Sequence, residues 1–158
     1  MLLASFLEPR NILFENRVLT KEQLYQILVD RLCSQYKLPI CGSKLMELIL
    51  QRDEEVSPAY STGIAIPHIR MENFNDTLIA MAFLQNPLDY NGIKVSWVVL
   101  IITDKTSSKL YLNIVAALLK LSNDKEAVAD LHNTGDGHSV IQYLKKKEVE
   151  VKKDVTIA

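Results

Sequence analysis

Two long apolar runs constrain the fold of this chain more than any other feature. Residues 77–84 and 96–103 are each eight residues long, carry no charged side chain and include β-branched members. A strand with one face in water alternates apolar and polar side chains, whereas a continuous apolar run is typical of a strand covered on both faces. The two runs are therefore predicted to be neighbouring core strands of one sheet, with helices packed on both of its faces.

Helical signals on both sides of these runs supply the covering layers. Thr20 and Gln23 form the pattern of a capping box ahead of apolar residues at helical spacing. Pro39 and Gly42 interrupt the chain before Ser43, which is predicted to cap a second helix. The expected helices cover residues 20–36, 43–52, 108–122, 125–131 and 139–147. This order of elements predicts an α/β fold, a single layered domain with a mixed β-sheet and helices on both faces.

The length of 158 residues fits one domain. We assign residues 1–147 to this domain and residues 148–158 to a charged C-terminal tail. Apolar residues alternate with charged or polar ones in the tail, which fits either an added edge strand or a frayed end. Acidic residues interrupt the lysines near this end, which favours a solvated tail over an arm that binds nucleic acid.

Charge and cysteine content predict the compartment and exclude some partners. The formal net charge of −1 gives no general attraction to nucleic acid or to an anionic membrane. The apolar residues 1–7 are too few for a signal peptide or a membrane span, so we expect a cytoplasmic protein without direct membrane insertion. In that compartment Cys33 and Cys41 are expected to be reduced, and their spacing fits neither a C-x-x-C motif nor a zinc pattern.

The segment Gly63–His68 ends in His68, the residue that says most about the chemistry of this chain. Residues 64–66 suit a strand, and Pro67 lacks an N–H, so we expect the strand to stop there and to present His68 at its end. A neutral imidazole, with an unperturbed pKa of about 6.5, carries a lone pair that can attack phosphorus or another electrophile. The same ring also suits a purely structural role, and the hexamer alone leaves both interpretations open.

The hexamer resembles the active-site segment of the enzyme IIA components of the bacterial phosphotransferase system (PTS), in the mannitol/fructose/nitrogen-regulatory (type 2) family. Other segments also resemble this family, namely residues 7–12, 20–24 and 93–95. The resemblance covers about residues 5–147 and implies the fold of a type 2 enzyme IIA.

The resemblance also implies roles for three residues. His68 would accept a phosphoryl group at its outer imidazole nitrogen, Arg52 would stabilise the phosphoryl charge, and Ser57 would help to fix the active-site loop. Arg52 lies 16 residues before His68. Its guanidinium can bind two oxygens at once, although an arginine at a helix end also serves the helix dipole or a surface carboxylate such as Asp53.

Two departures from the family pattern bear on the phosphoryl group. The family usually places a second histidine at the start of the helix that begins near residue 109, where this chain has Tyr111 or Asn113. Either side chain can donate a hydrogen bond to a phosphoryl oxygen, but neither carries a positive charge at neutral pH. Ile69 and Arg70 replace the small residues that commonly follow the active histidine. Ile69 is expected to narrow access to the site, and Arg70 to replace part of the lost positive charge.

Other motifs give no competing chemistry. His132 and His138 flank residues 133–137, but no third ligand lies at zinc spacing, so a zinc site is not expected. Residues 133–137 are predicted to form a turn before the last helix. The sequence contains no Walker loop, no paired-carboxylate motif and no G-x-S-x-G elbow, so nucleotide binding and hydrolysis have no support.

Three functions fit the resemblance. The leading hypothesis is a phosphoryl carrier that accepts a phosphoryl group from the phosphocarrier protein HPr or a homologue and passes it to a sugar-permease IIB component. The second is a signalling protein of the nitrogen-regulatory type, whose phosphorylation state controls another protein. The third is a degenerate member that binds partners without being phosphorylated. The phosphoryl transfer needs neither a metal nor an organic cofactor.

Overall fold

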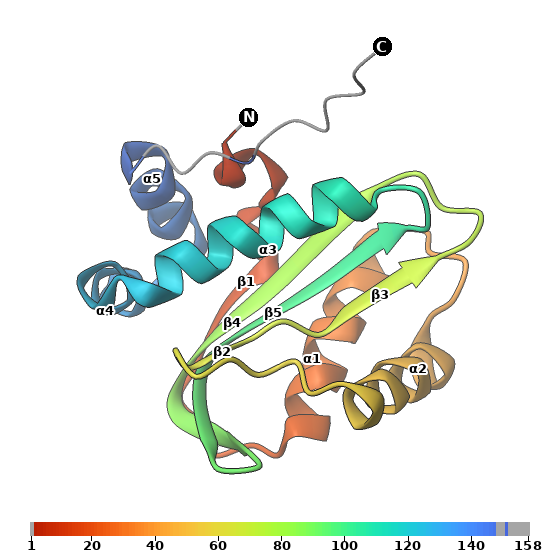
Figure 1. Cartoon of the computed structure of the whole chain (residues 1–158), viewed down its shortest axis with the longest axis horizontal. Coiled ribbons are helices and arrows are strands. Elements are labelled where there is room, and N and C mark those ends of the chain that lie inside the picture. Colours follow the sequence, from red (N-terminus) through yellow and green to blue (C-terminus); the bar gives the residue numbers. More distant parts are fainter. Residues whose placement is uncertain (1, 148–150, 152–158) are drawn as a thin grey trace.

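The structure, a computed structural model, describes residues 2–147 and residue 151 and has an α/β fold (Figure 1). Two 3-10 helices, η1 (Leu3–Phe6) and η2 (Pro9–Asn11), open the chain. The strands are β1 (Ile12–Glu15), β2 (Ile64–Ala65), β3 (His68–Met71), β4 (Thr77–Tyr90) and β5 (Ile93–Asp104). The α-helices are α1 (Lys21–Gln35), α2 (Gly42–Glu55), α3 (Ser108–Asn123), α4 (Lys125–Thr134) and α5 (Gly137–Lys147).

The five strands form one mixed sheet in the order β1-β4-β5-β2, and β3 also pairs with β5. The two predicted core strands lie side by side as β4 and β5, which are antiparallel, while β1, β2 and β3 each pair in parallel with one of them. The predicted mixed sheet is therefore confirmed, with the two apolar runs at its centre.

Helices cover both faces of the sheet, as the continuous apolar runs predicted (Figure 1). Trp97, Val99 and Ile101 of β5 belong to the core formed with α3, α4 and α5. The intervening Val98 and Leu100 belong to the core formed with α1 and α2. Alternate residues of one strand thus enter opposite cores, because successive side chains of a strand point to opposite faces.

The central strands are longer than their apolar runs. A β-hairpin extends β4 to Tyr90 and starts β5 at Ile93, and its turn residues Asn91 and Gly92 both have positive φ angles, of 52° and 96°. An Asn-Gly pair favours this hairpin turn because both residues tolerate the left-handed region. The apolar runs alone gave no sign of this extension.

The strand stops before Pro67, as predicted, since β2 ends at Ala65, but a further strand that the sequence did not predict begins at His68. The chain continues as β3, and the carbonyl of Pro67 accepts a hydrogen bond of 3.0 Å from the N–H of Ile101 in β5. Proline interrupts the edge between β2 and β3 but still contributes its carbonyl to the pairing with β5. His68 is consequently the first residue of β3 and is held against β5 opposite Ile101.

Helix caps agree with the sequence only in part. The capping box of α1 is confirmed, with hydrogen bonds of 3.1 and 2.9 Å between Thr20 and Gln23. Ser43 does not cap α2, which begins at Gly42 without a side-chain cap. α4 is capped by Asp124, which accepts from the N–H of Ala127 at 3.0 Å. No helix among the described residues is both long and apolar enough to cross a membrane.

Most of the predicted tail lies outside the described residues. Val151 is described, and it is buried against the core of α3, α4 and α5.

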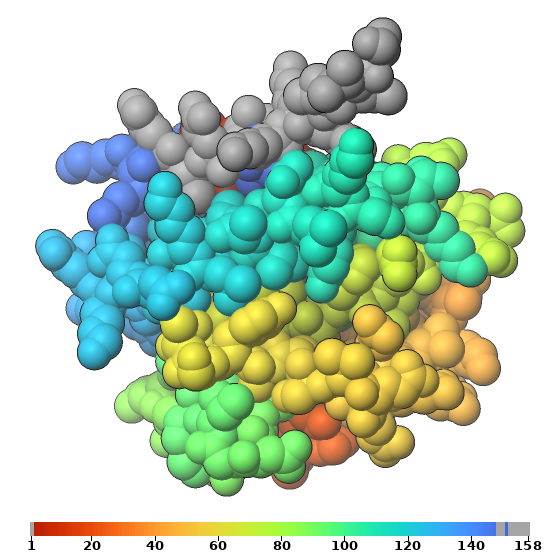
Figure 2. Space-filling model, in the orientation of Figure 1, coloured from red at the N-terminus to blue at the C-terminus, as the bar shows by residue number. Residues whose placement is uncertain are grey.

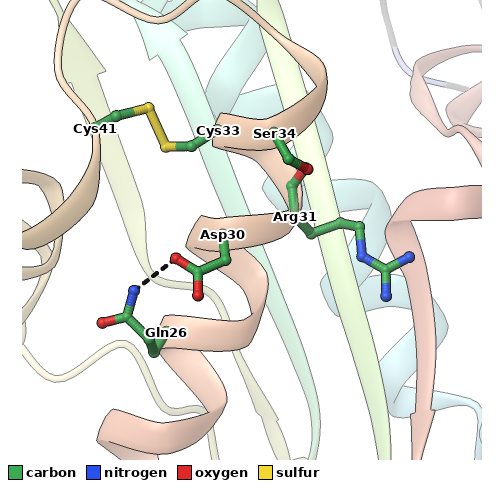
Figure 3. The surroundings of a disulfide bond; sticks show 6 residues. All are labelled: Gln26, Asp30, Arg31, Cys33, Ser34 and Cys41. Atoms are coloured by element: carbon green, nitrogen blue, oxygen red, sulfur yellow. Dashed lines mark hydrogen bonds between the residues drawn. A yellow bond between two sulfur atoms is a disulfide. The ribbon is translucent and has the colours of Figure 1, made fainter.

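The prediction of two reduced cysteines is contradicted by a disulfide between Cys33 and Cys41 (Figure 3). Cys33 lies near the end of α1 and Cys41 directly precedes α2, so the bond joins the two helices of one layer. The chain reverses between these helices and brings the two Cα atoms to 5.9 Å, within the range that a disulfide spans. Local motif spacing could not reveal a contact that depends on how two helices pack.

Reducing this disulfide should lower the free energy of unfolding by about 2.5 kcal/mol, the chain-entropy value for a loop of this length. Urea denaturation with and without dithiothreitol measures the effect. A variant in which Cys33 and Cys41 are both alanine is the control and should not respond to the reductant. Titratable free thiols in the unreduced native protein would contradict the bond.

Candidate functional site

His68 lies on the face of the sheet that α3 covers. Side chains alternate along β3, so His68 and Arg70 share this face while Ile69 points to the opposite one. Ile69 is 9% exposed and packs in the core with α1 and α2. It therefore does not narrow access to His68, and that prediction is wrong. Figure 2 shows α3 lying directly against the segment that leads to β3.

Two neighbours fix the imidazole of His68. Its Nε2 atom is 2.7 Å from the hydroxyl oxygen of Thr103 on β5. Its ring stacks on the ring of Tyr111 on α3, with centroids 3.6 Å apart and an angle of 14° between the planes. Of the two candidate positions on α3, Tyr111 is thus the one whose ring stacks on His68.

A small cavity of about 70 Å³ lies beside the ring and brings most of the predicted residues together. Its lining includes His68, Arg52, Ser57 and Tyr111 but not Asn113. Val56, Pro58 and Tyr60 of the loop after α2 complete one wall. Residues from α2, this loop, β3 and α3 thus meet at one point, although the sequence separates them by up to 59 positions.

The two arginines near His68 come from different elements. Arg52 lies in the last turn of α2, its side chain is 55% exposed, and its guanidinium is 3.6 Å from the carboxylate of Glu55. Arg70 is exposed on β3, and its Nη1 donates a 3.2 Å hydrogen bond to the hydroxyl of Ser108 at the start of α3. Neither arginine is locked in a buried ion pair, so both can turn towards an anion.

Ser57 stabilises the loop that borders the cavity. Its hydroxyl oxygen accepts a 3.3 Å hydrogen bond from the N–H of Ala59. The loop is also tied to the strand that follows it, since the N–H of Ile66 donates to the carbonyl of Pro58 at 2.9 Å. The serine side chain still has its own hydrogen to donate.

The surroundings of His68 keep its imidazole neutral. Burial lowers the pKa of His68 to about 4, and the positive charges of Arg70 and then Arg52 add to this shift. At pH 7 the ring therefore keeps a nitrogen lone pair. Burial also raises the pKa of Tyr111, so this side chain remains a neutral hydrogen-bond donor.

Two features of the site were missed from the sequence. One is the buried hydroxyl of Thr103, which was counted only as the end of an apolar run. The other is Asp53, which is not a surface carboxylate and does not pair with Arg52. Its side chain is 3% exposed, accepts a 2.6 Å hydrogen bond from Tyr25 and lies 3.5 Å from the ammonium of Lys21.

Asp53, which also lines the cavity, is held in place by a chain of hydrogen bonds. Tyr25 donates its hydrogen to Asp53, so the 2.8 Å contact between the hydroxyls of Tyr25 and Tyr90 must be donated by Tyr90. Burial raises the pKa of Asp53, against the opposing effects of Tyr25 and Lys21. The network joins α1, α2 and β4 through the residue that follows Arg52.

The other histidines lie away from this site. Both ring nitrogens of His132 face carbonyl oxygens, those of Val128 at 2.9 Å and Ser96 at 3.1 Å, which fits a structural role. His138 lies at the start of α5, and the connection before it is only residues 135–136, shorter than the turn predicted for residues 133–137. The part of the chain that the structure describes holds no cluster of three potential metal ligands.

Comparisons with known proteins agree with this architecture. The family model described as "Phosphoenolpyruvate-dependent sugar phosphotransferase system, EIIA 2" matches residues 5–147. A "Nitrogen regulatory protein" of Bradyrhizobium diazoefficiens is 24% identical over 150 residues, which cover 91% of this chain and 95% of that protein.

Solved structures show the same fold. The nitrogen regulatory protein IIA-Ntr from Neisseria meningitidis has a TM-score of 0.73 at 19% identity, with 90% of this chain and 98% of that chain covered. Enzyme IIA mannitol from Escherichia coli, in its complex with phosphorylated enzyme IIB mannitol, has a TM-score of 0.68 at 15% identity, with 89% and 97% covered.

The depressed pKa makes the stability of the protein depend on pH. Between pH 6.5 and about 4 the unfolded chain protonates His68 more readily than the folded one, so this histidine lowers native stability as the pH falls through that window. We expect the His68 ring signals to titrate near pH 4 in NMR spectra.

Comparison with His68→Gln tests whether the protonation of His68 contributes to this pH dependence of stability. Wild-type protein should lose more unfolding free energy than His68→Gln between pH 7 and pH 5, measured by urea denaturation. Because the other titrating groups are shared, equal losses, or a titration midpoint near 6.5, would contradict the buried neutral ring.

Proposed function

Because the chain belongs to the phosphoenolpyruvate-dependent sugar phosphotransferase system EIIA 2 family, we propose that it is a phosphoryl carrier whose acceptor is His68. The observation that carries the proposal is a histidine that stays neutral at pH 7 while two arginines flank it. The lone pair of a neutral imidazole can attack phosphorus, and the cations stabilise the added negative charge.

The phosphoryl donor is a phosphohistidine on a phosphocarrier protein of the HPr type. In the transfer a lone pair on the His68 imidazole forms a new bond to phosphorus. The bond from phosphorus to the donor histidine breaks, and its electron pair stays on the donor nitrogen. No metal or organic cofactor takes part in this exchange.

Arg52 and Arg70 bind the phosphoryl oxygens in this proposal. Both guanidiniums lie close enough to His68 to lower its pKa, and neither is fixed in a buried ion pair. Arg70 takes the place of the positive charge that a second histidine supplies in the family, while Tyr111 provides a stacked neutral ring. Ser57 contributes its hydroxyl hydrogen and holds the loop.

The group then passes to one of two kinds of recipient. An enzyme IIB component is supported by the E. coli relative of known structure, which forms a complex with phosphorylated enzyme IIB mannitol. A regulated protein is supported by the relatives described as nitrogen regulatory proteins. A third outcome is a binding module without transfer. It is motivated by Tyr111, which stands in place of the family's second histidine, and it applies if His68 does not accept a phosphoryl group.

Incubation with phosphoenolpyruvate, enzyme I and the cognate phosphocarrier protein should add one acid-labile phosphoryl group. Mass spectrometry should find the group in wild-type protein and in His138→Ala, and should not find it in His68→Ala. A gain that survives His68→Ala would reject this site. No gain in wild-type protein would reject the carrier function and favour the binding module.

Substitution of the arginines tests the charge of the site. Arg52→Ala and Arg70→Ala should each slow phosphorylation by about 10- to 1,000-fold, the range expected for the loss of one transition-state donor. Arg52→Lys should recover only part of the rate, because an ammonium does not bind two oxygens at once. Arg17→Ala, which removes an exposed arginine outside the cavity lining, is the control and should keep the wild-type rate. Loss of the circular dichroism signal in Arg52→Ala would make Arg52 structural.

A further inference from the structure

The hydroxyl of Thr103 is a buried polar group at the end of the apolar run of β5. Thr103 is 0% exposed, and the two residues before it on β5, Ile101 and Ile102, are buried apolar residues. Within the described residues its hydroxyl makes one hydrogen bond, the 2.7 Å contact with Nε2 of His68. A buried hydroxyl is costly unless its hydrogen finds an acceptor.

The direction of this hydrogen bond follows from satisfying both groups. A hydroxyl has one hydrogen to donate, and Nε2 is the acceptor that lies within reach of Thr103. If Nε2 carried the hydrogen instead, the Thr103 hydrogen would be left buried without a partner. Thr103 therefore donates, and the Nε2 lone pair accepts.

We propose that Thr103 is a positioning residue whose hydroxyl fixes His68 in the neutral tautomer with its hydrogen on Nδ1 and its lone pair on Nε2. The hydrogen bond made by one ring nitrogen sets the protonation of the other. Nδ1 makes no hydrogen bond within the described residues, so its hydrogen can point to solvent. The low pKa of His68 agrees with a ring that stays neutral.

Thr103 and Tyr111 constrain the ring in complementary ways. The stacking contact with Tyr111 fixes the plane of the imidazole, at an angle of 14°. The hydrogen bond to Thr103 fixes the rotation within that plane, since it aims Nε2 at one atom. Together they determine which nitrogen carries the lone pair and where it points.

For phosphoryl transfer this inference rests on the proposed function. The Nε2 lone pair forms the bond to phosphorus, while the bond from phosphorus to the donor nitrogen breaks with its electrons left on the donor. Nδ1 already carries the ring hydrogen, so no proton has to leave Nε2 first. Because the Thr103 oxygen lies 2.7 Å from Nε2 on the lone-pair side, the ring and this hydroxyl must move apart before phosphorus can bond to Nε2, and the hydroxyl then donates to a phosphoryl oxygen.

Nitrogen-15 NMR of the unphosphorylated protein at pH 7 tests the tautomer directly. Wild-type His68 should show a protonated Nδ1 and an unprotonated Nε2, with His68→Gln used to identify its signals. Thr103→Val should lose this pattern and shift towards the Nε2–H form, whereas Thr103→Ser should keep it. An Nε2–H tautomer in the wild type, or an unchanged tautomer in Thr103→Val, would overturn the inference.

Phosphorylation rates provide the second measurement. Thr103→Val should slow the transfer about five- to tenfold, the loss expected for one hydrogen bond, and Thr103→Ser should restore it. Thr77→Val is the matched control, because Thr77 is the cross-strand partner of Thr103, while the hydrogen bond to Nε2 of His68 comes from Thr103. Thermal melting shows that each variant is folded.

The two measurements separate this inference from the proposed function. If wild-type protein takes no phosphoryl group but shows the Nδ1–H tautomer that Thr103→Val loses, the carrier function fails and the role of Thr103 stands. If it is phosphorylated on His68 but Thr103→Val changes neither tautomer nor rate, the carrier function stands and the role of Thr103 fails.

Discussion

The antiparallel pairing of β4 and β5 is the interaction on which the rest of the structure depends. Each of the other strands pairs with one of these two, and the cores on both faces of the sheet are built on their alternating side chains. The pairing of β3 with β5 places His68 opposite Ile101, from where its ring reaches the Thr103 hydroxyl. A slip of one residue in this register would turn His68 to the other face of the sheet.

The proposed transfer makes two demands on the surroundings of the His68 imidazole. They must keep the ring unprotonated before transfer and stabilise the phosphoryl charge afterwards. Arginines suit a phosphoryl group after transfer, yet their charges and the burial of the ring disfavour protonation of His68 beforehand. In the proposed transfer these two effects are compatible, because a ring that is to accept phosphorus must be unprotonated at one nitrogen. A stacked tyrosine in place of a second histidine leaves this balance to Arg52 and Arg70.

Sequence patterns predicted the layers of the fold and the members of the site better than their exact connections. The continuous apolar runs identified the central strands because burial on both faces leaves a direct trace in composition. The resemblance brought His68, Arg52, Ser57 and Tyr111 to one place, and the cavity lining agrees. The separate strand β3 after Pro67 escaped notice because its pairing with β5 depends on backbone groups rather than on a side-chain pattern. The disulfide and the Thr103 hydrogen bond depend on tertiary packing, which no local pattern records.

Asp53 gives helix α2 a fixed rotation about its own axis. Adjacent residues of a helix point about 100° apart, so the neighbours Arg52 and Asp53 face different surroundings. The Asp53 carboxylate fits the hydroxyl of Tyr25 and the ammonium of Lys21, whereas Arg52 is left at the cavity with its charge half in water. A turn of α2 by one position would place a guanidinium beside that ammonium and bury two like charges. The contacts of Asp53 thus favour one rotation of α2 about its axis, the one that leaves Arg52 in the lining of the cavity that also contains His68.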